Sequence, residues 1–124
     1  MFTHIMVGTN DPARAFEFYD AVLGAIGVEG HHMGERAFYR GASGAFGVGK
    51  PANGEPATVG NGGTIGFACE SQAQVDAWHA AGCANGGKSI EDPPGIRESG
   101  FGPLYLAYVR DPDGNKLCAM YRAG

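Results

Sequence analysis

Two stretches of the sequence, FTHIMVGTNDPARAFEFYDAVLG (residues 2–24) and NGGTIGFACESQAQVDAWHAAGC (residues 61–83), follow the same plan about sixty positions apart. Each begins with a short run of bulky apolar or β-branched residues, which is typical of a strand. A helix-capping residue follows, Asp11 in the first stretch and Ser71 in the second, and then an apolar stripe at helical spacing. The repeat predicts a strand followed by a helix in each half of the chain.

The elements that follow each strand-helix pair complete the repeat. The first helix is expected from Pro12 to Leu23, with Gly24 as its stop, and the second ends near residues 83–84. The turn sequence DPDGN, residues 111–115, predicts an antiparallel hairpin. Each half is therefore predicted to be a βαβββ unit, with long connections at residues 49–63 and 93–103. The remaining β-type runs are residues 25–32, 36–40 and 45–48 in the first half and residues 88–91, 104–110 and 116–122 in the second.

The composition is that of one globular domain. The 124 residues suffice for one core, so we expect a single domain, residues 1–124, with halves of about 1–50 and 62–124. Nine Lys and Arg against thirteen Asp and Glu give a net charge of −4, without a basic run. Neither nucleic acid nor an anionic membrane is therefore expected as a partner. Because the chain shows no membrane-length apolar stretch and no signal-peptide pattern, a cytoplasmic location is expected. The three cysteines are an odd number without CxxC spacing, so they are expected to be reduced thiols.

Five motifs together resemble a known family: HIMV at residues 4–7, DPARAFEFY at 11–19, TIGF at 64–67, VDAWHAAG at 75–82 and YVRDPDGNKL at 108–117. The chain is similar along nearly its whole length to the vicinal oxygen chelate superfamily. That superfamily includes glyoxalase I, methylmalonyl-CoA epimerase, the bleomycin and fosfomycin resistance proteins and the extradiol dioxygenases. The resemblance implies an α+β fold in which two βαβββ repeats form an open, curled eight-stranded sheet around a cleft, with the helices outside.

The same resemblance gives four cleft positions that hold a divalent metal in the metal-using members. His4 matches the first position, whereas residues 45–48 supply no Glu or His for the second. Thr64 stands where the third ligand is usually His, and Cys118 where the fourth is usually Glu. Two protein ligands fall short of the three usual for catalytic zinc. We therefore expect no cofactor, and a divalent metal bound by His4 and Cys118 is the less favoured alternative.

Strand alternation selects the side chains that face the expected cleft. It places His4 on one face of the first strand, and Cys118 and Met120 on one face of the last strand. A five-residue DPDGN loop pairs Tyr108 with Cys118, which favours Tyr108 for the same cleft. His4 is the candidate catalytic residue, because imidazole titrates nearest neutrality. The alternatives are a core histidine, an inert packed thiol and an ordinary core tyrosine.

Arg97 lies in a segment rich in glycine and proline, PPGIRESGFGP at residues 93–103. A guanidinium on such a loop can close over a carboxylate or phosphate of a ligand, and the alternative is a solvated surface arginine. The ligand-binding candidates are thus Thr64, Arg97, Tyr108, Cys118 and Met120.

Three functions are compatible with these residues. The missing metal ligands favour a small-molecule-binding protein that encloses its ligand without altering it. The first alternative is a lyase, isomerase or dioxygenase-like enzyme that uses His4, and the second is a dimerisation module with a vestigial cleft. A homodimer is expected in each case, because an open sheet leaves edges and apolar surface to be covered.

Overall fold

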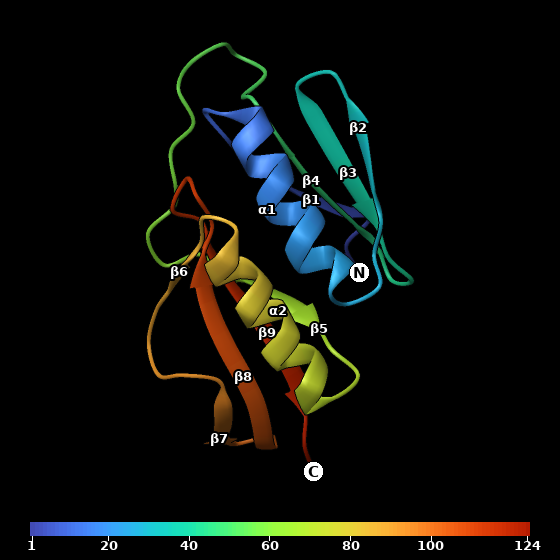
Figure 1. Cartoon of the computed structure of the whole chain (residues 1–124), viewed down its shortest axis with the longest axis vertical. Helices are drawn as coiled ribbons and strands as arrows, with labels where there is room; N and C mark the ends of the chain where they lie inside the picture. Colours follow the sequence, from blue (N-terminus) through green and yellow to red (C-terminus); the bar gives the residue numbers. More distant parts are fainter.

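The chain folds into two successive units with the same order of elements (Figure 1). The computed structural model describes all 124 residues. The first unit contains β1 (His4–Gly8), α1 (Pro12–Gly24), β2 (Gly30–Met33), β3 (Arg36–Arg40) and β4 (Ala45–Gly49). The second contains β5 (Ile65–Ala68), α2 (Gln72–Ala84), β6 (Lys88–Ser89), β7 (Gly95–Ser99), β8 (Gly102–Arg110) and β9 (Lys116–Arg122).

Each unit builds its own mixed sheet. The N-terminal sheet has the strand order β1-β4-β3-β2, and the C-terminal sheet has the order β5-β9-β8-β6, with β7 also paired to β8. The first strand of each unit runs parallel to its last strand, β1 beside β4 and β5 beside β9. The α+β class with two βαβββ units is therefore confirmed. In this chain the strands number nine and form two separately hydrogen-bonded sheets, in place of one eight-stranded sheet.

Both helices begin at the capping residues that the repeat indicated. The Asp11 side chain accepts a hydrogen bond from the Arg14 backbone N–H at 3.2 Å, and the Ser71 hydroxyl accepts one from Gln74 at 3.1 Å. Such caps satisfy backbone donors that have no partner inside the helix, and each is worth about 1 kcal/mol. The equivalence of the two strand-helix pairs is thus visible in their local hydrogen bonds.

The strand predicted at residues 88–91 is shorter, since β6 ends at Ser89, and two further segments differ more from the prediction. Residues 25–28 form the turn that ends α1, with Ile26 N–H donating to Leu23 O, so β2 begins only at Gly30. Residues 93–103, expected as a long connection, contain β7, which pairs antiparallel with β8. A two-residue turn joins these strands. The Ser99 hydroxyl donates a hydrogen bond to the Gly102 carbonyl oxygen across the turn at 2.7 Å, and Gly102 adopts the positive φ that the turn requires. The high glycine and proline content of this segment is typical of a loop, and for that reason the sequence did not predict the hairpin.

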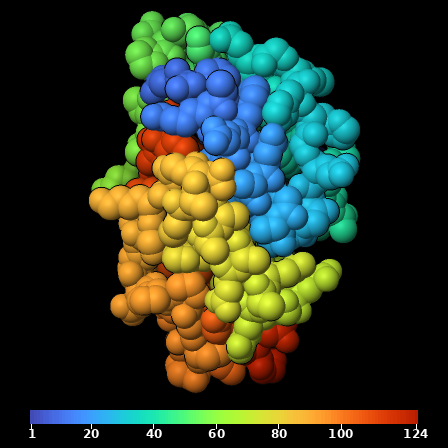
Figure 2. Space-filling view, viewed as in Figure 1, coloured from blue at the N-terminus to red at the C-terminus, as the bar shows by residue number.

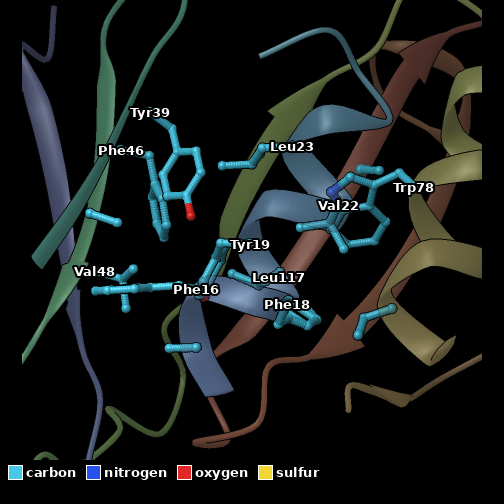
Figure 3. Packing of buried hydrophobic residues seen from close by; sticks show 14 of the residues in the cluster. Phe16, Phe18, Tyr19, Val22, Leu23, Tyr39, Phe46, Val48, Trp78 and Leu117 are labelled. Carbon is cyan, nitrogen blue, oxygen red and sulfur yellow. The ribbon is translucent and has the colours of Figure 1, made fainter. Parts of the chain in front are cut away.

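One continuous core links the two units. The helices lie side by side in front of the strands (Figure 1), and Val22 of α1 faces Trp78 of α2, both fully buried (Figure 3). Across the sheets, the Phe46 and Phe67 rings meet edge to face with centroids 5.3 Å apart. The space-filling view shows the two halves in contact across the width of this face (Figure 2). Neither helix has the length and apolar character required to cross a membrane.

Candidate ligand-binding site

The C-terminal sheet has one face under α2 and one face that no helix covers, here called the C-terminal open face. The DPDGN hairpin pairs Tyr108 with Cys118 and Leu106 with Met120, as the five-residue loop predicted. The alternate residues Val109 and Leu117 are fully buried on the helix side. The predicted pairing of Tyr108 with Cys118 is thereby confirmed, and Met120 lies on the same face of the sheet.

Free space lies over the β5 edge of this face. Gly66 of β5 is beside Cys118 of β9, it is exposed, and a Cβ atom added there would meet nothing within 4 Å. Tyr108 and Met120 are half-buried, while Cys118 is 7% exposed. The open face therefore offers an apolar floor that carries one phenol and one thiol.

Lys116 and Glu91 border this floor. The Lys116 ammonium lies 5.0 Å from the centroid of the Tyr108 ring and 2.5 Å from Glu91 Oε2. Burial raises the pKa of the Cys118 thiol, and the hydrogen bond with Tyr108 opposes that shift only in part. An ordinary thiol is already mostly protonated at neutral pH, and burial disfavours the thiolate of Cys118 further.

Sequence reasoning overlooked both Lys116 and Glu91. The hairpin register could have placed Lys116 on the open face, because it pairs with Arg110, two positions from Tyr108. No comparable signal existed for Glu91. It has a φ of 60° and is the one non-glycine residue of the chain with a positive φ, a conformation that its side-chain chemistry does not predict.

His4 belongs to the other sheet. It is exposed on the side of β1 that faces away from α1, and its Nδ1 is 2.9 Å from the Thr3 hydroxyl. The core-histidine alternative is therefore wrong. With Met6, Arg36 and Phe38, His4 borders a cavity of about 560 Å³ that residues 50–58 close on one side.

A second cavity, of about 430 Å³, lies between the edge strands β1 and β5. His4 reaches its rim, and its walls include Tyr39, Phe46, Ile65 and Phe67. Cys118 lines neither this cavity nor the one beside Arg36. The meeting of His4 and Cys118 across one cleft thus stays a prediction.

Thr64 and Arg97 lie at the border of the C-terminal open face. Thr64 is exposed and directly precedes β5, two residues before Gly66. The Arg97 guanidinium donates to the carbonyl oxygens of Asp92 at 2.9 Å and of Pro93 and Gly95 at 3.0 Å. These bonds hold Arg97 on its own loop, where it neither extends into solvent nor pairs with a carboxylate. Contact of Thr64 or Arg97 with a ligand stays a prediction.

No three His, Cys, Asp or Glu side chains of one chain converge in the way a metal site requires. The adjacent residues His31 and His32 point to opposite faces of β2. His32 bonds Asp20 of α1 at 3.0 Å and packs on the Phe16 ring, whereas His31 pairs with Phe38 on the side away from α1. The donor set of one chain, His4 and Cys118 on separate sheets, does not fit a divalent metal.

Two successive βαβββ units whose helices pack against each other define the class of this α+β fold. A sequence model described as the Glyoxalase/Bleomycin resistance protein/Dioxygenase superfamily matches residues 1–119. The chain belongs to this superfamily.

Solved structures agree with that assignment. A glyoxalase/bleomycin resistance protein from Albidiferax ferrireducens T118 is 56% identical, with 98% of each chain covered and a TM-score of 0.95. A glyoxalase-related enzyme from Fulvimarina pelagi is 18% identical, covering 98% of this chain and 88% of that chain, with a TM-score of 0.76. Lactoylglutathione lyase from Agrobacterium tumefaciens is 21% identical, covering 97% and 92%, with a TM-score of 0.67. The last two likenesses concern the fold alone. No curated protein sequence matches the chain.

Proposed function

We propose that this protein binds a small organic molecule on its open sheet faces and does so without the divalent metal of its metal-using relatives. The observation that carries the proposal is the C-terminal open face, where Tyr108, Cys118 and Met120 share one face of the sheet and Gly66, beside Cys118, leaves free space. A half-buried aromatic ring beside an apolar floor suits a ligand with a flat or apolar body. The mostly protonated thiol adds polarity to this floor.

A second copy of the chain completes the proposed cleft. The helices α1 and α2 pack against each other, and each sheet keeps one face that its own helix does not cover. The strands β1 and β5 are each paired on one side only, which leaves two sheet edges with free backbone groups. A twofold dimer that sets the N-terminal sheet of one copy against the C-terminal sheet of the other brings His4 opposite Cys118 twice.

The second candidate function is catalysis by His4. Its exposure at the rim of both cavities favours this alternative, because an accessible imidazole can move a proton near neutral pH. The chemistry would be that of a lyase, isomerase or dioxygenase-like enzyme. It then needs a partner group for His4 from the ligand or from the second copy, since no carboxylate of the same chain bonds the imidazole.

Metal analysis of the purified protein, followed by a thermal-shift ligand screen with and without added Zn²⁺, tests the proposal. We expect no stoichiometric metal and a rise in Tm with an apolar or aromatic compound, and the rise should be lost in Tyr108→Ala. A stoichiometric divalent metal would move the assignment to the enzyme. If no compound shifts the Tm and Tyr108→Ala changes nothing but stability, the open face is not a ligand site and the dimerisation module is favoured.

A further inference from the structure

The cationic side chains of this acidic protein are concentrated on the open faces of its sheets. The register places seven of its nine Lys and Arg there, although the net charge is −4. No strand position on either open face holds Asp or Glu. The seven are Arg36 and Arg40 on the N-terminal sheet and Lys88, Arg97, Arg110, Lys116 and Arg122 on the C-terminal sheet.

Most of this positive charge is not neutralised within the chain. On the C-terminal open face, Arg97 donates to backbone carbonyls, Arg110 to Gly114 O at 2.8 Å and Arg122 to Phe101 O at 3.3 Å. A carbonyl oxygen orients a guanidinium without cancelling its charge. An open face built in this way attracts anions.

Lys116 is the exception, because Glu91 supplies a carboxylate to it. Glu91 lies in the loop after β6, outside the strands, and its side chain is 48% exposed. It reaches Lys116 from a backbone with positive φ, which a non-glycine residue adopts at a cost. In the Lys116–Glu91 ion pair, the carboxylate is therefore accessible and belongs to a strained loop. The Lys116 ammonium also lies over the Tyr108 ring.

We infer that the ligand of this site carries an oxyanion on an apolar body, and that the oxyanion replaces the Glu91 carboxylate on Lys116. The inference rests on the proposed function and specifies its ligand class. The apolar body lies against Tyr108 and Met120, and the charged group lies at the Lys116 end of the face. When the anion binds, Glu91 is released and the loop can leave its strained conformation.

Fluorescence titration with two probes of similar shape tests the charge requirement. The anion is 8-anilinonaphthalene-1-sulfonate, and the neutral control is N-phenyl-1-naphthylamine. We expect Glu91→Gln to tighten sulfonate binding by about threefold to tenfold, because it removes a competing carboxylate, and Lys116→Gln to weaken it by about tenfold. Neither substitution should change binding of the neutral probe by more than about twofold. Glu17→Gln on the exposed side of α1 makes the same charge change away from both open faces and should leave both affinities unaltered.

The outcomes separate the inference from the proposed function. If Glu91→Gln and Lys116→Gln leave the affinities of both probes unchanged while Tyr108→Ala weakens both, the ligand site stands and the oxyanion requirement is overturned. If Tyr108→Ala affects neither probe, the proposed site itself is wrong. Competition of the bound sulfonate by benzoate and by phenyl phosphate then distinguishes a carboxylate ligand from a phosphate ligand. Failure of both to compete also overturns the inference.

Discussion

The Tyr19 hydroxyl of α1 donates a hydrogen bond to Asp111 Oδ2, in the turn between β8 and β9, at 2.5 Å. The bond joins the two units, and both residues are buried, Tyr19 completely and Asp111 with 4% exposure. The same carboxylate accepts hydrogen bonds from the backbone of Asp113 and Asn115 at 2.9 Å, so it also shapes the turn. The DPDGN sequence thus holds a hairpin together and fixes that hairpin against the first helix.

Removal of this hydroxyl should destabilise the whole fold. We expect Tyr19→Phe to lower the free energy of unfolding by about 1–2 kcal/mol, because Asp111 Oδ2 keeps only its bond from Asn115 in a buried place. Urea unfolding monitored by circular dichroism measures the loss. The control is Tyr105→Phe, whose hydroxyl bonds Asp76 at 2.7 Å near the surface, with an expected cost below about 0.5 kcal/mol. If the two variants lost equal free energies of unfolding, the hydrogen bond between the units would contribute no more to stability than a surface hydrogen bond.

Stability should fall at alkaline pH through Cys69. Burial raises the pKa of this thiol from 9.0 to about 11 in the folded protein, offset in part by a backbone hydrogen bond with Met120. Since the folded state prefers the protonated thiol, its contribution is complete below about pH 9 and is lost as the pH rises through 11. Urea midpoints at pH 8, 9 and 10 should fall less steeply in Cys69→Ala than in the parent. Cys83→Ala removes an exposed thiol and should keep the parent's slope, and an identical slope in Cys69→Ala would contradict the assignment.

Restoring the family's ligand types should create a metal site. If His4 of one copy meets the C-terminal open face of the other, Thr64→His with Cys118→Glu supplies three ligands. Zinc affinity should then rise by at least about a hundredfold in calorimetry. Adding His4→Ala should abolish the gain, and Thr64→Asn with Cys118→Gln controls for side-chain size. A folded double variant that binds zinc no better than the parent would show that these positions do not converge.

The protein in solution should be a homodimer. Light scattering at micromolar concentration is expected to give about twice the chain mass of 12.9 kDa, because the open faces and the free edges of β1 and β5 require cover. A mass near that of one chain would contradict both the dimer and the cleft proposed between copies. It would leave ligand binding to a single open face.

The sequence alone determined the features that depend on neighbours along the chain. Asp11 and Ser71 begin their helices because a side-chain oxygen satisfies a backbone N–H three residues ahead. The DPDGN turn fixed the pairing of Tyr108 with Cys118, because loop length sets the register of a hairpin and alternation sets its faces. The repeat and one face of the candidate site followed from these local rules, and the superfamily followed from the resemblance of the motifs to known members.

Only the tertiary structure decided which distant groups meet. It placed His4 and Cys118 on separate sheets, because β1 pairs with β4 and β9 pairs with β5, while the two units pack together through their helices. It also brought Glu91 to Lys116 through a loop conformation that the side chain of Glu91 does not predict. Such contacts depend on how two units bury a shared apolar surface, which is a property of the whole chain and not of any short stretch of it.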